Sequence, residues 1–181
     1  MAELKRGRDA ALARPTRTQR FIEDKLQEAA RRRERVGAAL YRLEPNIKDG
    51  QGGLRELHLA LWLSRARWGV STVRGLVKHG ELSSTEGELL ERAHGFMLLL
   101  RTALHLAARR RQDNLRFDYQ EAIAEQLGFR LGLSEKRSKK AGVERLMRAF
   151  YYNARLMEVH SARVVERATS HRRRRTTRES I

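Results

Sequence analysis

The chain has 181 residues, 40% of them apolar and 34% charged, and its 39 lysines and arginines against 22 aspartates and glutamates give a formal net charge of +17. This length and composition predict one globular domain, and the absence of cysteine excludes disulfides, thiolate catalysis and cysteine-ligated metal sites. No apolar run approaches the ~20 residues of a membrane span and no signal-peptide core opens the sequence, so we expect a cytoplasmic protein without membrane association.

Both ends of the chain are basic and lack sustained apolar periodicity. We therefore expect residues 1–15 and 167–181 to form basic flexible tails around a helical domain of residues 16–166. The first helix is predicted to begin near Thr16 or Thr18, and Pro45 closes this segment. Its apolar side is predicted to hold Phe21, Leu26, Ala29 and Ala30.

An irregular, glycine-rich stretch follows at Glu44–Gly53, and a second helix is predicted from Leu54. Its apolar stripe holds Leu54, Leu57, Leu61 and Trp68, with Trp62 beside it. A short helix that ends at Gly80 comes next. Ser83 then has the sequence of an N-cap, with Glu86 at the capping-box spacing.

The helix after this cap is predicted to be central and well buried, because its apolar face is wide. That face holds Leu89, Leu90, Ala93, Phe96, Met97, Leu100, Ala103, Leu104 and Ala107. Asp118 and Glu121 repeat the capping-box spacing and predict a short helix through Leu127. The polar stretch Leu131–Lys140 predicts a connection, and a last long helix is predicted at about Val143–Val165.

No strand pattern competes with these helices, and no repeat of solenoid period is visible. The predicted fold is therefore all-α. We expect a bundle of roughly six helices, with antiparallel neighbours joined by short loops and basic tails at both ends.

The sequence contains no recognisable catalytic constellation. It has no Asp-x-Asp pair for magnesium, no His-Asp dipeptide, no His-Glu-x-x-His, no P-loop and no Gly-x-Ser-x-Gly elbow. His94 and His105 lie near one helix face but about three turns apart, which is too far for one ion. We predict no catalytic residue and no metal site on this chain.

The segment Glu44–His58 is the most informative part of the sequence. Its glycines allow backbone amides to approach a ligand closely, and a helix starting at Leu54 is expected to point free N–H groups back into the loop. Lys48 and Arg55 add positive charge, so the segment could cradle a phosphate. A glycine-rich turn whose polar residues merely cap helix ends explains the same pattern, and the residues alone leave both readings open.

This segment resembles the signature of bacterial protein-PII uridylyltransferases, the bifunctional uridylyltransferase/uridylyl-removing enzymes of nitrogen control. A related motif occurs more distantly in glutamine synthetase adenylyltransferases. Ordered matches to the family span about Phe21 to Val165. Beyond the loop, the segments that carry the resemblance are His79–Leu82, Leu100–Leu106, Asp113–Gln120, Ala124–Phe129 and Val143–Met147.

The resemblance implies a helical middle domain. In the family, a nucleotidyltransferase domain with an Asp-x-Asp pair precedes this region, and a His-Asp phosphohydrolase domain and two ligand-sensing domains follow it; this chain contains none of these motifs. We therefore expect a fragment, a split-gene product or a remnant that is inactive alone. The chain itself is expected to bind no cofactor, and Mg²⁺ and UTP would act only with a separate catalytic domain.

The resemblance also implies which residues matter, because the family's loop packs beside the nucleotidyltransferase active site. The positions carried over are Lys48, Asp49, Gly50, Gly52, Gly53, Arg55 and Glu56. The two basic residues are expected to meet phosphate or a carboxylate across the domain seam, and the two acids to orient them. Gln51 stands where the family usually has proline, and Glu56 where it usually has aspartate.

The implied partners are the nucleotidyltransferase catalytic domain, in cis or in trans, and the PII protein. Two alternatives remain open. A basic helical nucleic-acid-binding protein would explain the charge, although the aromatic residues lie on core stripes rather than among the arginines, so any such binding is expected to be weak and nonspecific. A nonfunctional remnant would fold and bind nothing.

Overall fold

The computed structural model describes residues 17–36, 43–129 and 135–170, and within them it contains six α-helices and no strand beyond one isolated β-bridge. The all-α prediction is confirmed. The helices are α2 (Arg17–Val36), α3 (Leu54–Trp68), α4 (Val73–Lys78), α5 (Ser84–Ala108), α6 (Phe117–Gln126) and α7 (Glu135–Thr169). None of these helices has both the length and the apolarity that a membrane crossing requires.

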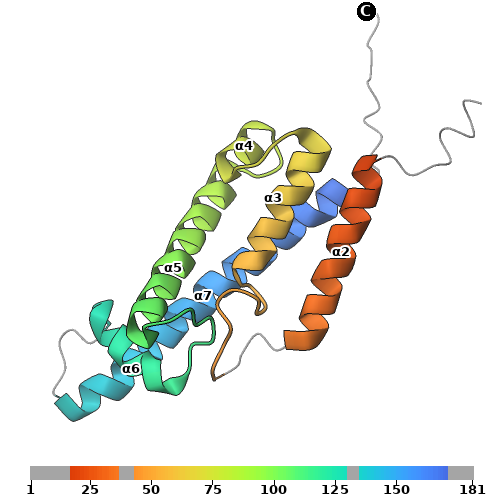
Figure 1. Cartoon of the computed structure of the whole chain (residues 1–181). Helices are drawn as coiled ribbons and strands as arrows, with labels where there is room; N and C mark the ends of the chain where they lie inside the picture. The colour runs from red at the N-terminus through yellow and green to blue at the C-terminus, as the bar shows by residue number, and fades with distance from the viewer. Residues whose placement is uncertain (1–16, 37–42, 130–134, 171–181) are drawn as a thin grey trace, which may run out of the picture.

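Helix α7 is the longest helix, and α3, α5 and α6 all pack against it. It crosses behind α3 and α5, with α2 beside α3, α4 at one end and α6 at the other (Figure 1). The main core lies where α3, α5 and α6 meet α7. Its fully or almost fully buried side chains include Ile47, Leu57, Met97, Leu104, Ile123 and Phe150. Because Ile47 belongs to this core, the segment before α3 is anchored to the bundle.

A second, smaller apolar cluster joins α2 to α3 and the end of α7. It contains Ile22, Ala29, Leu59, Leu63 and Ala168. Helix α3 is thus buried on two sides, and Leu63 is fully buried while Leu61 is only partly so. The predicted single stripe missed the second side, because the spacing of leucines does not reveal that α2 returns to cover it.

The predicted apolar side of α2 is partly wrong. Ile22 and Ala29 are buried, but Phe21 and Ala30 are exposed. The contact face consists of Ile22, Leu26 and Ala29, which pack into the smaller cluster, so α2 contributes none of the described residues of the main core.

The Ser83 capping box is confirmed, since the Ser83 hydroxyl accepts from the Glu86 N–H and the Glu86 carboxylate accepts from the Ser83 N–H. The predicted Asp118 cap is wrong. Arg116 is at the N-cap and helix α6 begins at Phe117, two residues before the start that an Asp118 cap implies; the Phe117 N–H donates to Glu44 Oε1 at 2.9 Å. A residue distant in sequence thus binds the first N–H of the helix, and the N-cap residue makes no side-chain capping bond.

The last helix is longer than predicted. It starts at Glu135, so much of the expected connection at Leu131–Lys140 is helical, and residues 130–134 lie outside the described part. Lysine, arginine and alanine favour helix without apolar periodicity, which is why the pattern alone placed the start near Val143. Helix α7 also crosses the predicted domain boundary at residue 166. Residues 1–16 and 171–181, which include the whole predicted N-terminal tail and most of the predicted C-terminal tail, are not described.

Three histidines make stability sensitive to acid. Burial lowers the pKa of His58, His94 and His160 below the ordinary value. At these three histidines the unfolded chain therefore binds more protons than the folded one as pH falls, and the free energy of unfolding decreases below about pH 6.5. Urea melts at about pH 7.5 and about pH 5.5 should show this loss, and His94→Gln should reduce it. Equal stability at the two pH values would contradict the prediction.

Candidate functional site

The loop before α3 is a compact turn built on Asn46. Asn46 Oδ1 accepts from the N–H groups of Lys48 at 3.1 Å and Asp49 at 2.6 Å, and the Asn46 carbonyl accepts from Gly50 at 3.1 Å. Such a side-chain-to-backbone turn fixes the chain direction without secondary structure. A side chain at Gly50 would collide with the Asn46 carbonyl oxygen, so this turn requires glycine.

The N–H groups expected to be free at the start of α3 are not free. Leu54 donates to the Ile47 carbonyl at 3.1 Å, Arg55 to that of Lys48 at 2.9 Å, and Gly53 to that of Gly50 at 2.9 Å. The loop thus caps the helix with its own carbonyl groups. Of the two readings left open, these contacts favour the glycine-rich capping turn over a backbone phosphate cradle, and the charged side chains remain as the groups that could contact an anion.

Gly52 presses the loop against α7. It has a φ of +69°, and a Cβ at this position would collide with the carbonyl of Ala154. Its neighbour Gln51 donates through Nε2 to Glu158 Oε1 at 2.6 Å. Gln51, at the position where the family usually has proline, therefore ties the loop to α7.

The other side of the loop is paired with the segment between α5 and α6. Ile47 N–H donates to the Asp113 carbonyl at 2.8 Å, and Leu115 N–H donates to the Pro45 carbonyl at 2.8 Å. The side chains of Asn46 and Asn114 also hydrogen-bond, at 2.7 Å. Two segments that carry the family resemblance, far apart in sequence, are therefore held side by side.

Asp113 gathers three basic side chains at this junction. Its carboxylate lies 2.7 Å from Arg101 Nε, 3.6 Å from Lys48 Nζ and 3.6 Å from His105 Nε2. Burial opposes ionisation, but the Arg101 hydrogen bond and the charges of Arg101 and Lys48 outweigh it, so the pKa of Asp113 is lowered. Lys48 is thus oriented by Asp113, not by Asp49 or Glu56 as the sequence suggested.

Arg55 lies on a different side of the loop, toward α2. Its Nε is 3.5 Å from Asp49 Oδ1, and Arg32 Nε of α2 is 3.9 Å from the same oxygen. The predicted orienting role of Asp49 toward Arg55 thus has a geometric basis. A hollow of about 340 Å³ opens here, lined by Glu28, Arg32, Arg35, Asp49 and Arg55.

Glu56 faces neither Lys48 nor Arg55. Its carboxylate pairs with Arg33 of α2 at 3.3 Å. Burial raises the pKa of Glu56, with the Glu158 carboxylate adding to the effect and Arg33 opposing it. Glu56, in the first turn of α3, therefore joins α3 to α2.

Sequence reasoning missed the α2 residues and left Arg101, His105 and Asp113 out of the site. The last three lie in segments that carry the family resemblance, so the resemblance could have identified them. No signal in the sequence identified the α2 arginines, because a run of arginines on a helix is the ordinary pattern of a solvated face. Within the described ranges, no group of three or more His, Cys, Asp or Glu side chains is arranged to hold a metal ion.

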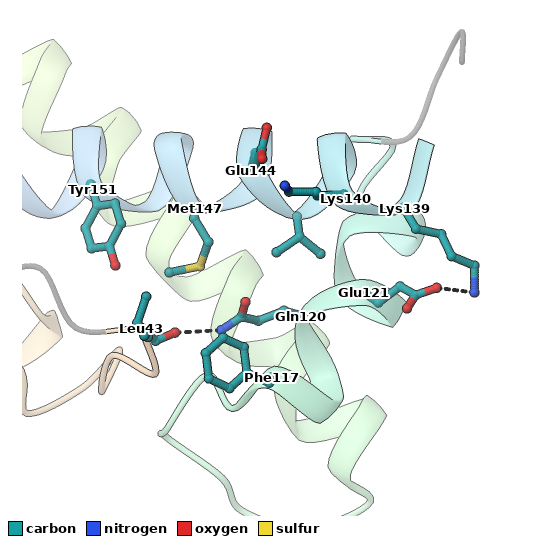
Figure 2. Close-up of a pocket in the computed structure, with 10 residues that line it drawn as sticks. Leu43, Phe117, Gln120, Glu121, Lys139, Lys140, Glu144, Met147 and Tyr151 are labelled. Carbon is teal, nitrogen blue, oxygen red and sulfur yellow. Dashed lines mark hydrogen bonds and ion pairs between the residues drawn. The ribbon is translucent and has the colours of Figure 1, made fainter. Parts of the chain in front are cut away.

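A larger hollow, of about 540 Å³, lies between α6 and α7 and is mainly apolar. Figure 2 shows Phe117, Met147 and Tyr151 around it, with Gln120 Nε2 donating to the Leu43 carbonyl at 2.8 Å and Lys139 paired with Glu121. It contains none of the predicted site residues. The charged loop is therefore the stronger candidate for a functional site.

Comparisons with known proteins agree with the motif resemblance. The family model described as GlnD PII-uridylyltransferase matches residues 20–165. A bifunctional uridylyltransferase/uridylyl-removing enzyme of Rhodospirillum rubrum is 43% identical over 135 residues, which are 75% of this chain and 14% of that protein. One from Xanthomonas campestris is 38% identical over 147 residues, 81% of this chain and 16% of that protein. The chain thus spans only a small part of these relatives. No solved structure matches it.

Proposed function

The chain belongs to the GlnD PII-uridylyltransferase family, and we propose that it acts as a helical accessory domain of such a nucleotidyltransferase. In this role it presents its glycine-rich basic loop to the nucleotidyltransferase pocket or to the seam between the two domains. It supplies no catalytic carboxylate pair. Chemistry at the pocket, with UTP and Mg²⁺, belongs to the catalytic domain, in cis or in trans, and PII is the protein substrate.

The observation that carries the proposal is the way the loop is held. It is fixed to α7 through Gly52 and Gln51, and to the α5–α6 junction through backbone pairing. Lys48 and Arg55 nevertheless keep about a third of their side chains exposed, at 31% and 32%. A rigid loop with accessible basic groups is suited to binding an anionic partner with little loss of entropy.

Reconstitution tests the proposal. We expect neither this chain nor a separately expressed catalytic domain to transfer labelled UMP from UTP to PII efficiently alone, whereas their mixture should do so. Arg55→Ala should weaken the mixture's activity. The matched control is Arg65→Ala, an exposed arginine at the other end of α3. Magnesium-dependent transfer by this chain alone would refute the accessory role, as would a catalytic domain whose activity is indifferent to the chain.

A further inference from the structure

The hollow between α2 and the loop brings together residues from three elements. Helix α2 contributes Glu28, Arg32 and Arg35, the loop contributes Asp49, and the first turn of α3 contributes Arg55. Three guanidinium groups thus face two carboxylates in a space of about 340 Å³. That volume lies within the range of small-molecule sites, roughly 300–1,000 Å³.

The carboxylates in this hollow hold the arginines only loosely. One oxygen of Asp49 is shared by Arg55 at 3.5 Å and Arg32 at 3.9 Å, and Arg32 lies 3.7 Å from Glu28. These separations exceed the usual length of a charge-assisted hydrogen bond, about 2.7–2.9 Å. Glu28 is also engaged by Lys25 at 2.6 Å. Each guanidinium carries five N–H donors. Within the described residues these ion pairs involve only Nε of Arg55 and Nε and Nη1 of Arg32, so other nitrogens of both groups can donate to a ligand.

We propose that this hollow binds the phosphate chain of a nucleoside triphosphate, with Arg55 and Arg32 as the principal ligands and Arg35 at the rim. The inference rests on the proposed function, which brings a nucleotide to this seam. A planar guanidinium group can donate two parallel hydrogen bonds to two phosphate oxygens. Several such groups close together suit a short chain of closely spaced anionic groups. Among the residues that the structure describes, no aromatic side chain lines the hollow, so this part of the chain offers no stacking platform of the kind found in single-stranded nucleic-acid sites.

Helix α2 supplies one part of this site, and the loop with α3 supplies the other. Besides the small apolar cluster, α2 reaches the loop and α3 through charged pairs, Arg32 with Asp49 and Arg33 with Glu56. Helix α2 thus completes a site whose other half lies on the loop and α3. The loop and α3 together provide only one of the three guanidinium groups, that of Arg55.

Calorimetric titration of the full chain tests the assignment, with sodium triphosphate and UTP as separate probes at about 150 mM salt, where nonspecific electrostatic binding is weakened. Arg55→Gln and Arg32→Gln should each weaken triphosphate binding about tenfold, and Arg55→Lys, which keeps the charge, by a smaller factor. The matched control is Arg31→Gln, on the same helix but outside the hollow, and it should change affinity less than about twofold. Tighter binding of UTP than of triphosphate would identify the nucleotide as the source of the phosphate chain.

Two results would overturn the site. One is the absence of saturable binding of either probe by the wild-type chain. The other is an equal loss in Arg31→Gln and Arg32→Gln, which would mean that the probes sense only overall charge. A single-stranded oligonucleotide that displaces triphosphate and is equally sensitive to substitution of Arg31, Arg32 and Arg55 would favour nonspecific nucleic-acid binding instead. Reconstituted transferase activity that persists in Arg32→Gln would leave the accessory function standing and refute the hollow alone.

Discussion

Gly52→Ala is expected to lower the free energy of unfolding by about 2–5 kcal/mol. Two costs add at this position. A non-glycine residue is strained at a φ of +69°, and the new Cβ would collide with the backbone carbonyl of Ala154. Because a helix carbonyl in the middle of α7 cannot rotate away, either the loop or α7 must move. Urea melts of the two proteins measure the effect.

Gly80→Ala is the matched control for this prediction. Gly80 also has a positive φ, of +80°, but a Cβ there meets nothing within 4 Å. It should therefore carry only the backbone strain, about 1 kcal/mol relative to alanine in an ordinary conformation. If Gly52→Ala is no more destabilising than Gly80→Ala, the contact between the loop and α7 is not tight and the rigid-loop argument fails.

The helices of the main core could be predicted because their positions follow local rules. Leu90, Met97 and Leu104 repeat at helical spacing on α5, and Ser83 with Glu86 is a complete local cap. The start of α6 could not be placed in the same way. Its first N–H is bound by Glu44, 73 residues away, so the local Asp118 signal lost to a tertiary partner.

The candidate site shows the same division. The glycine-rich loop was evident from composition, and the family resemblance pointed to Lys48 and Arg55. Their partners were not evident, because Asp113 and Arg32 reach the loop only once α5 and α2 are packed. The expected free amides failed for a related reason, since loop carbonyls of Ile47 and Lys48 satisfy them. Periodicity predicted the buried face of α5, missed the second buried side of α3, and gave no information on which polar groups meet.

Leu57→Ala and Arg55→Ala, two residues apart on α3, should separate folding from function. Leu57 is fully buried in the main core, so its truncation should cost about 2–5 kcal/mol. Arg55 has 32% of its side chain exposed and a 3.5 Å ion pair with Asp49, so its loss should cost about 1 kcal/mol or less. Leu61, which the sequence placed on the buried stripe, is only partly buried, so Leu61→Ala should lower the free energy of unfolding less than Leu57→Ala does.

Binding to a separately expressed catalytic domain should respond in the opposite order when only folded protein is compared. Arg55→Ala removes a charge from the loop side without changing the core, so it should weaken binding, whereas folded Leu57→Ala keeps the loop surface. The measurement is a urea melt and a binding titration for each variant. If Arg55→Ala unfolds the domain as severely as Leu57→Ala, the residue is structural and the proposed contact fails. If Arg55→Ala changes neither stability nor binding, the Arg55 charge is dispensable both for the fold and for the partner. The loop then has no role in binding the catalytic domain.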